Sequence, residues 1–106
     1  MYGIMFIDEA KPGKFQELVD FMTWDAEICR DKEPDTLRFE FYQHPENENA
    51  IIVYEAYTDK DAFQTHWDTN EAVRHWVSAN LEEKLLVSRR VLFADEAIFS
   101  PTDEPS

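Results

Sequence analysis

Three side chains with acid–base chemistry stand close together in the middle of the sequence. Glu55 and Tyr57 lie near the end of a strand pattern, and His66 follows in a helical pattern. Residues two apart on a strand point to the same face of a sheet. If Glu55 lies in an aromatic pocket, burial raises its pKa, and with His66 it could act as a general acid/base pair. We expect these three residues to be catalytic, removing a proton from a phenol or from a carbon beside a carbonyl.

The same residues also have a purely structural interpretation. Buried polar groups are nearly always hydrogen-bonded, so Glu55 and His66 could simply bond to each other or to a helix end. Aromatic residues nearby are the candidate substrate-binding residues, although tryptophan is found more often in a core than in a ligand site. The expected substrate-binding residues are Phe39, Phe63, Trp67 and Trp76.

Other reactive residue types form no recognisable site. The three histidines show no metal-ligand spacing, so no metal site is expected, and His44 and His75 are placed at the surface. The single Cys29 is interpreted as a small buried residue of a reducing cytoplasm rather than as a nucleophile. Arg89 and Arg90 could bind an acidic ligand, but an ion pair with one of the 23 acidic side chains is the preferred interpretation.

Length and charge restrict the class of protein. A chain of 106 residues with 43% hydrophobic content suits one globular domain. The net charge of −13 argues against nucleic acid and against anionic membrane surfaces as partners. No apolar run reaches the roughly 18 residues of a membrane span, and the N-terminus lacks the basic segment of a secretory signal. We therefore expect a cytoplasmic protein.

Hydrophobic periodicity predicts the elements that position the candidate residues. Alternation indicates strands over residues 2–10, 36–44, 50–57 and 85–99. A helix follows Pro12 and ends at Glu33, because the residue before Pro34 is pushed out of the helical region. Two further helices are expected after the cap-like segments 58–61 and 68–71. Residues 1–99 form one domain, and residues 100–106 are expected to be a disordered tail.

This order of elements predicts an α+β fold of the ferredoxin-like, split βαβ type. Its four-stranded antiparallel sheet would carry helices on one face. Residues 51–54 are apolar on both faces of their strand, which indicates that something covers the second face. The expected cover is another copy of the chain, giving a homodimer through the sheet face, and the long last strand could reach across to it.

The segments Leu-Arg-Phe-Glu-Phe-Tyr-Gln at 37–43 and Tyr-Glu-Ala-Tyr at 54–57, with Asp59, Ala62 and His66, resemble the antibiotic biosynthesis monooxygenase domain family. The resemblance implies a homodimeric α/β barrel in which two sheets pack face to face. It also implies a pocket between helices and sheet in each subunit. The implied activity is monooxygenation of a small phenolic or quinol-like aromatic substrate, with no cofactor.

The sequence also departs from the family pattern. Tyr57 stands where family members commonly have Trp, Val53 where polyketide-type monooxygenases have Asn, and Phe63 where they have Tyr. The haem-degrading members use an Asn on the first strand, and Met5 and its neighbours offer none. Two alternatives to a monooxygenase therefore stay open. One is an acid/base isomerase of a small metabolite on the same scaffold, and the other is a non-catalytic ligand-binding or dimerisation module.

Overall fold

The structure of the protein is a computed structural model that describes residues 1–96. Its strands and helices follow one another in the order that the sequence predicts, with one additional short helix before the last strand. In chain order the elements are β1 (Tyr2–Ala10), α1 (Phe15–Lys32), β2 (Thr36–Gln43), β3 (Ala50–Tyr57), α2 (Lys60–Thr69), α3 (Glu71–Ser78), α4 (Leu81–Leu85) and β4 (Leu86–Glu96).

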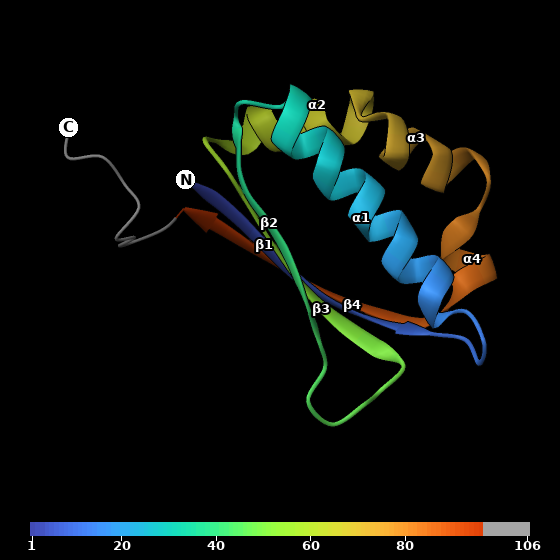
Figure 1. Ribbon diagram of the computed structural model, residues 1–106. Coiled ribbons are helices and arrows are strands. Elements are labelled where there is room, and N and C mark those ends of the chain that lie inside the picture. The colour runs from blue at the N-terminus through green and yellow to red at the C-terminus, as the bar shows by residue number, and fades with distance from the viewer. Residues whose placement is uncertain (97–106) are drawn as a thin grey trace.

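The strands form one antiparallel sheet in the order β2-β3-β1-β4. The helices all lie on one face of this sheet, with α1 crossing above it and α2 and α3 beside α1 (Figure 1). This arrangement confirms the predicted α+β, ferredoxin-like fold. The register places Glu55 of β3 opposite Ile4 of β1 and Phe39 of β2, in the middle of the sheet.

The ends of the helices follow local sequence signals. Helix α1 ends at Lys32, and Glu33 caps it just before Pro34, as predicted. Helix α2 is capped by Asp59, whose side chain accepts a hydrogen bond from the backbone N–H of Ala62. The cap-like segment 58–61 therefore works through Asp59 and not through Thr58. A carboxylate at the N-cap position accepts a hydrogen bond from one of the unpaired backbone N–H groups in the first turn of a helix.

Asn70 links the second and third helices. Its backbone N–H bonds to the carbonyl of His66 at the end of α2, and its side chain accepts from Val73 N at 3.1 Å to begin α3. One residue thus ends one helix and starts the next, which fixes the direction of α2 close to His66. The predicted break between these two helices is confirmed.

The region before the last strand differs from the prediction. Asn80 adopts a left-handed conformation with φ 54°, and the short helix α4 follows it. β4 consequently begins at Leu86, because Leu85 belongs to this helix. The predicted strand continued to residue 99, and residues 97–99 and the predicted tail 100–106 lie outside the described residues.

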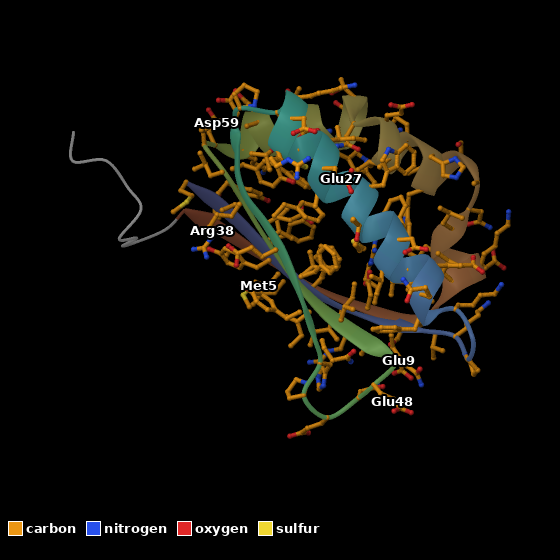
Figure 2. The ribbon with its side chains drawn as sticks, viewed as in Figure 1. Met5, Glu9, Glu27, Arg38, Glu48 and Asp59 are labelled. Carbon is orange, nitrogen blue, oxygen red and sulfur yellow. The ribbon has the colours of Figure 1, made fainter. Side chains whose placement is uncertain are left out.

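The core lies between the sheet and the helices, where Leu18 of α1 packs against apolar residues of β1 and β3. The opposite face of the sheet is open and partly apolar. Met5, Tyr42 and Leu92 on that face are 42%, 54% and 65% exposed. Met5 and Arg38 lie on the side of the sheet away from α1 (Figure 2). Within the described residues, no helix is long and apolar enough to cross a lipid bilayer.

Candidate active site

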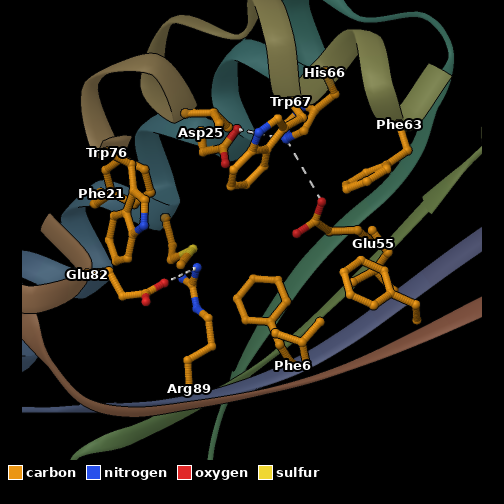
Figure 3. A pocket seen from close by; sticks show the side chains of 15 residues that line it. Phe6, Phe21, Asp25, Glu55, Phe63, His66, Trp67, Trp76, Glu82 and Arg89 are labelled. Atoms are coloured by element: carbon orange, nitrogen blue, oxygen red, sulfur yellow. Dashed lines mark hydrogen bonds and ion pairs between the residues drawn. The ribbon is translucent and has the colours of Figure 1, made fainter. Parts of the chain in front are cut away.

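A cavity of about 240 Å³ lies between the sheet and the helices (Figure 3). Phe6, Glu55 and Arg89 come from three adjacent strands, and Asp25 and His66 come from α1 and α2. We call this cavity the apolar pocket, because most of its remaining lining is aromatic or aliphatic. A cavity of roughly 150 Å³ holds benzene, so the apolar pocket has room for one substituted aromatic ring.

The structure brings most of the predicted site residues to this pocket. Its lining includes Glu55, Phe63, His66, Trp67 and Trp76. The two other predicted residues lie behind it. Tyr57 is fully buried and donates a hydrogen bond to Glu55, and the Phe39 ring lies 6.4 Å from the His66 ring, measured between ring centroids.

His66 is the central polar residue of the pocket and is only 4% exposed. Its Nδ1 lies 2.7 Å from Glu33 Oε1. Its Nε2 lies 3.9 Å from both Asp25 Oδ1 and Glu55 Oε1 (Figure 3). An ionised carboxylate can only accept a hydrogen bond, so an ionised Glu33 requires Nδ1 to carry a hydrogen. In the neutral imidazole this leaves the Nε2 lone pair facing Asp25, Glu55 and the pocket.

Glu33 is anchored from two further sides. Asn70 Nδ2 donates to Glu33 Oε2 at 2.6 Å, and Thr36 Oγ1 donates to Glu33 Oε1 at 2.7 Å. Partial burial alone would raise the pKa of Glu33. The hydrogen bonds from His66, Asn70 and Thr36 outweigh that effect and lower this pKa to about 2. Glu33 is therefore the ionised partner of His66.

Asp25 and Glu55 behave in the opposite way. Burial raises the pKa of Asp25 to about 6, although the nearby charge of His66 opposes the shift. Burial likewise raises the pKa of Glu55 to about 7, against the hydrogen bond from Tyr57 and the charge of His66. Three titratable groups thus meet at one pocket, with two carboxyl pKa values near neutrality. Such a set of groups can take up and return protons at physiological pH.

The pKa of His66 is raised, even though burial alone would lower it. The hydrogen bond to Glu33 and the negative charges of Asp25 and Glu55 favour the imidazolium. Once Nε2 has accepted a proton, the surrounding carboxylates therefore stabilise the resulting cation. A raised pKa makes neutral His66 a stronger base, and the neutral form prevails at pH values above that pKa.

Sequence reasoning missed Asp25, Glu33 and Asn70. A usable signal for Asp25 existed, because it lies on the apolar stripe of α1, between the buried Met22 and Cys29. A carboxylate inside such a stripe is rare unless it is paired or functional. Glu33 and Asn70 carried no comparable signal, since both look like ordinary residues at helix ends.

Cys29 lies beside this polar cluster. Its Sγ is 3.6 Å from Asp25 Oδ1 and 3.7 Å from His66 Nδ1, and these three side chains together have the types and spacing of metal ligands. A metal would need the thiolate. Without a metal, burial, and then the charges of Asp25 and Glu33, raise the pKa of the Cys29 thiol, so the neutral thiol is the favoured form. The hydrogen bond from Nδ1 to Glu33 also occupies the nitrogen nearest the sulfur. The cluster is therefore better described as a hydrogen-bonded network than as a metal site.

The opposite end of the pocket is formed by Arg89 of β4. Its Nε and Nη2 donate to the two carboxylate oxygens of the fully buried Asp8, each at 2.7 Å. Its guanidinium carbon lies 4.7 Å from the Trp76 ring centroid and 4.9 Å from that of Phe6. The ion pair that the sequence favoured for Arg89 is present. It holds Arg89 between two aromatic rings of the pocket wall.

The chain is similar over most of its length to many solved structures, and three of them illustrate the likeness. A protein of Bacteroides thetaiotaomicron provisionally named an antibiotic biosynthesis monooxygenase is 15% identical, with a TM-score of 0.81 over 98% of this chain and 95% of that one. PA3566 of Pseudomonas aeruginosa is 19% identical, with a TM-score of 0.78 over 91% of this chain and 93% of that one. Rv0793 of Mycobacterium tuberculosis is 15% identical, with a TM-score of 0.76 over 99% of this chain and 98% of that one. At such identities the likeness concerns the fold alone.

The sequence comparisons are more specific about the family. No functionally curated protein matches the chain. Residues 1–79, however, match the family model described as antibiotic biosynthesis monooxygenase, and this match spans most of the chain, including α1, β3 and the helix that carries His66. The chain therefore belongs to the antibiotic biosynthesis monooxygenase family.

Proposed function

We propose that the protein is a cofactor-independent monooxygenase of a small phenolic or quinol-like aromatic compound, with His66 as its general base. The observation that carries this proposal is the orientation of His66. Its Nδ1 is held by Glu33 at 2.7 Å, and its Nε2 faces Asp25 and Glu55 at the apolar pocket. A base oriented in this way, beside aromatic walls, suits deprotonation of a ring hydroxyl.

The first step is proton transfer. Neutral His66 takes the hydroxyl proton of the substrate on Nε2, and the Nδ1–H remains bonded to Glu33. The imidazolium is then stabilised by Glu33 and by whichever of Asp25 and Glu55 is ionised. Trp76 and Phe63 line the pocket and supply aromatic surface for contact with the substrate ring.

The second step uses O₂ as the co-substrate. The electron-rich phenolate transfers one electron to O₂, and the two radicals combine at a ring carbon to form a carbon–oxygen bond. For a hydroquinone, the resulting peroxide loses water and leaves a hydroxyquinone. One oxygen atom enters the ring and the other leaves as water. The substrate supplies all four electrons, so the reaction requires no external reductant.

Oxygen uptake tests this proposal. Purified protein is supplied with a panel of substituted hydroquinones, and oxygen consumption is recorded for the wild type, for His66→Gln and for His75→Gln. His75 is exposed on α3, so its substitution is the matched control. We expect consumption by the wild type and the control, and a loss of about 10²- to 10⁴-fold in His66→Gln. Full activity in His66→Gln would contradict the proposal. Tight binding of the aromatic compounds without any turnover would instead indicate a binding module.

One observation favours a second candidate function, that of an acid/base isomerase. Two buried carboxyl groups, Asp25 and Glu55, whose pKa values burial raises to about 6 and about 7, flank one imidazole at 3.9 Å. Such a set can remove a proton from one carbon and return it to another, with no need for oxygen. Incorporation of deuterium from D₂O into a substrate under anaerobic conditions, with the same dependence on His66, would favour this alternative.

We also propose that two copies of the chain pair through the open face of the sheet. The support for this is the exposed apolar surface around Met5, Tyr42 and Leu92 on that face. Sedimentation should show a dimer for the wild type and a shift toward monomer for Leu92→Glu. Thr23→Glu, a substitution on the exposed side of α1, is the control and should remain dimeric. A monomeric wild type at micromolar concentration would remove this proposal.

A further inference from the structure

His66 lies between two cavities of different character. On one side is the apolar pocket. On the other side is a cavity of about 370 Å³, formed by the end of α1, the beginning of β2 and one side of α2. We call it the polar cavity, because its lining includes Glu33, Asp59 and Asp61. Among residues 1–96, His66 alone lines both cavities.

The two ring nitrogens of His66 face different cavities. Nε2 faces Asp25 and Glu55, which both line the apolar pocket. Nδ1 bonds to Glu33, which lines the polar cavity. Asp59 and Asp61 are exposed, so the polar cavity is open to water, and the Glu33 side chain itself is 18% exposed. The three acids around His66 therefore differ in their access to water.

Because the three acids differ in their access to water, they can have different roles beside His66. A carboxylate is most easily kept ionised where water and hydrogen-bond donors can reach it. Glu33 has both, through the polar cavity, Asn70 and Thr36. Asp25 and Glu55 face the apolar pocket, where ionisation is costly. The ionised partner of His66 can thus remain hydrated, and the base that it supports can still face the apolar pocket.

From this geometry we infer that Glu33 is the positioning residue of the site, acting through His66 from the polar cavity. This inference rests on the proposed role of His66 as a base. Glu33 holds the tautomer with hydrogen on Nδ1 and stabilises the imidazolium after Nε2 accepts the substrate proton. That proton is returned to the reduced oxygen in the same turnover, so the cycle closes without net proton release.

Other groups around His66 also act on its charge. Asp25 and Cys29 face it from α1, Glu55 from β3, and Asn70 lies at the junction of α2 and α3. Tyr57 acts indirectly, through its bond to Glu55. Asp25 and Glu55 lie 3.9 Å from His66, too far for a hydrogen bond, whereas Glu33 lies at 2.7 Å. Glu33 is therefore the group that can fix the tautomer.

Nitrogen NMR of His66 tests this inference without any substrate. In ¹⁵N-labelled wild type we expect the Nδ1–H tautomer and a raised pKa. In Glu33→Gln the carboxylate charge is lost, so the pKa of His66 should fall by about one unit or more. Glu27→Gln removes one charge from the exposed side of the same helix and should leave His66 unchanged. An unchanged pKa and tautomer in Glu33→Gln would overturn the inference.

Activity gives a second, independent readout. Glu33→Gln should lower kcat/KM by about 10²-fold or more and move the acidic limb of its pH profile to lower pH. In Glu33→Ala the lost carboxylate leaves a gap beside the polar cavity, and formate or acetate should restore part of the activity. Restoration by these acids, but not by chloride, distinguishes a charge role from a folding role. No restoration together with an unshifted pH profile would contradict the inference.

The outcomes also separate this inference from the proposed function. If His66→Gln keeps full activity while Glu33→Gln shifts the His66 pKa, the pairing stands and the proposed catalytic role fails. If His66→Gln is inactive while Glu33→Gln matches the wild type in NMR and in kinetics, the catalytic role stands and the inference fails.

Discussion

The Tyr57 hydroxyl donates a hydrogen bond to Glu55 Oε1, and both side chains rise from the same face of β3 toward the helices. Tyr57 is fully buried and does not line the apolar pocket, whereas Glu55 does. Burial, and then the charge of Glu55, raise the pKa of Tyr57, so this hydroxyl remains a donor at all ordinary pH values. Tyr57 therefore acts on the pocket through Glu55.

Removing this donor should change the titration of Glu55. The bond from Tyr57 favours the ionised carboxylate, so Tyr57→Phe should raise the pKa of Glu55 above its present value of about 7. The variant should also lose about 1 kcal/mol of unfolding free energy. Carbon NMR of labelled Glu55 measures the pKa, and urea denaturation measures the stability.

Tyr54→Phe is the control for this prediction. Tyr54 lies on the same strand but points to the opposite face of the sheet. The Tyr54→Phe variant should therefore leave the Glu55 titration unchanged. A Glu55 titration that is the same in Tyr57→Phe and in the wild type would show that the hydroxyl does not bind the carboxylate in solution.

Ionisation of Asp25 should lower the free energy of unfolding as the pH rises. In the unfolded chain an aspartate titrates near 3.8, and in the folded protein burial raises the pKa of Asp25 to about 6. The folded state therefore holds a proton that the unfolded state has lost, and stability falls as the pH rises from about 4 to above 6. A shift of this size corresponds to roughly 3 kcal/mol before coupling to His66 is considered.

Asp25→Asn removes this titration. The variant should gain stability at pH 8 relative to the wild type, and it should show a smaller difference at pH 4, where Asp25 is protonated in the folded state and close to half-protonated in the unfolded state. Thermal denaturation at the two pH values measures the effect, with Asp20→Asn on the exposed side of α1 as control. A larger gain at pH 4 than at pH 8 would contradict the prediction.

The Asp8–Arg89 pair should be essential to stability. Arg89→Leu leaves the Asp8 carboxylate fully buried without its cation, a change that typically costs about 3 to 5 kcal/mol. Arg30 is exposed on α1 and pairs at the surface with Asp31, so Arg30→Leu should change stability by less than about 0.5 kcal/mol. Urea denaturation of both variants gives the comparison. Equal effects of the two substitutions would show that the pair contributes little.

Cys29 should be unreactive in the folded protein. The side chain is 3% exposed, and burial together with nearby carboxylates raises the pKa of its thiol. Modification by a thiol reagent at pH 8 should therefore require unfolding, and its rate should increase steeply across the urea transition. Rapid modification of the native protein would indicate that α1 opens locally around this residue.

Much of the fold could be predicted because its signals are local. The alternation in β1 matches the buried and exposed faces of that strand, and Pro34 and Asn70 mark helix ends through their own chemistry. The helix α4 was not predicted, because its five residues are shorter than a hydrophobic repeat can reveal. Leu85 and Leu86 fit a strand pattern equally well, which is why the strand was expected to begin one residue earlier.

Only the part of the site that comes from segments close together in the sequence could be predicted. Glu55 and His66 lie on either side of one strand–helix connection, so their proximity follows from chain order. Asp25 and Glu33 reach His66 from α1, across 41 and 33 residues of sequence, through the packing of two helices that no local pattern specifies. Asp8 and Arg89 meet because β1 and β4 pair in one particular register, and that register is also a long-range property.

The positions of the tryptophans make intrinsic fluorescence a measure of ligand binding in the pocket. Trp67 and Trp76 form part of the apolar pocket, and the Arg89 guanidinium lies 4.7 Å from the Trp76 ring centroid. Trp24 contacts His75 outside that lining and supplies a background signal. An aromatic compound entering the pocket should quench or shift the emission of the first two indoles. Candidate compounds can therefore be ranked by fluorescence titration of the unlabelled protein.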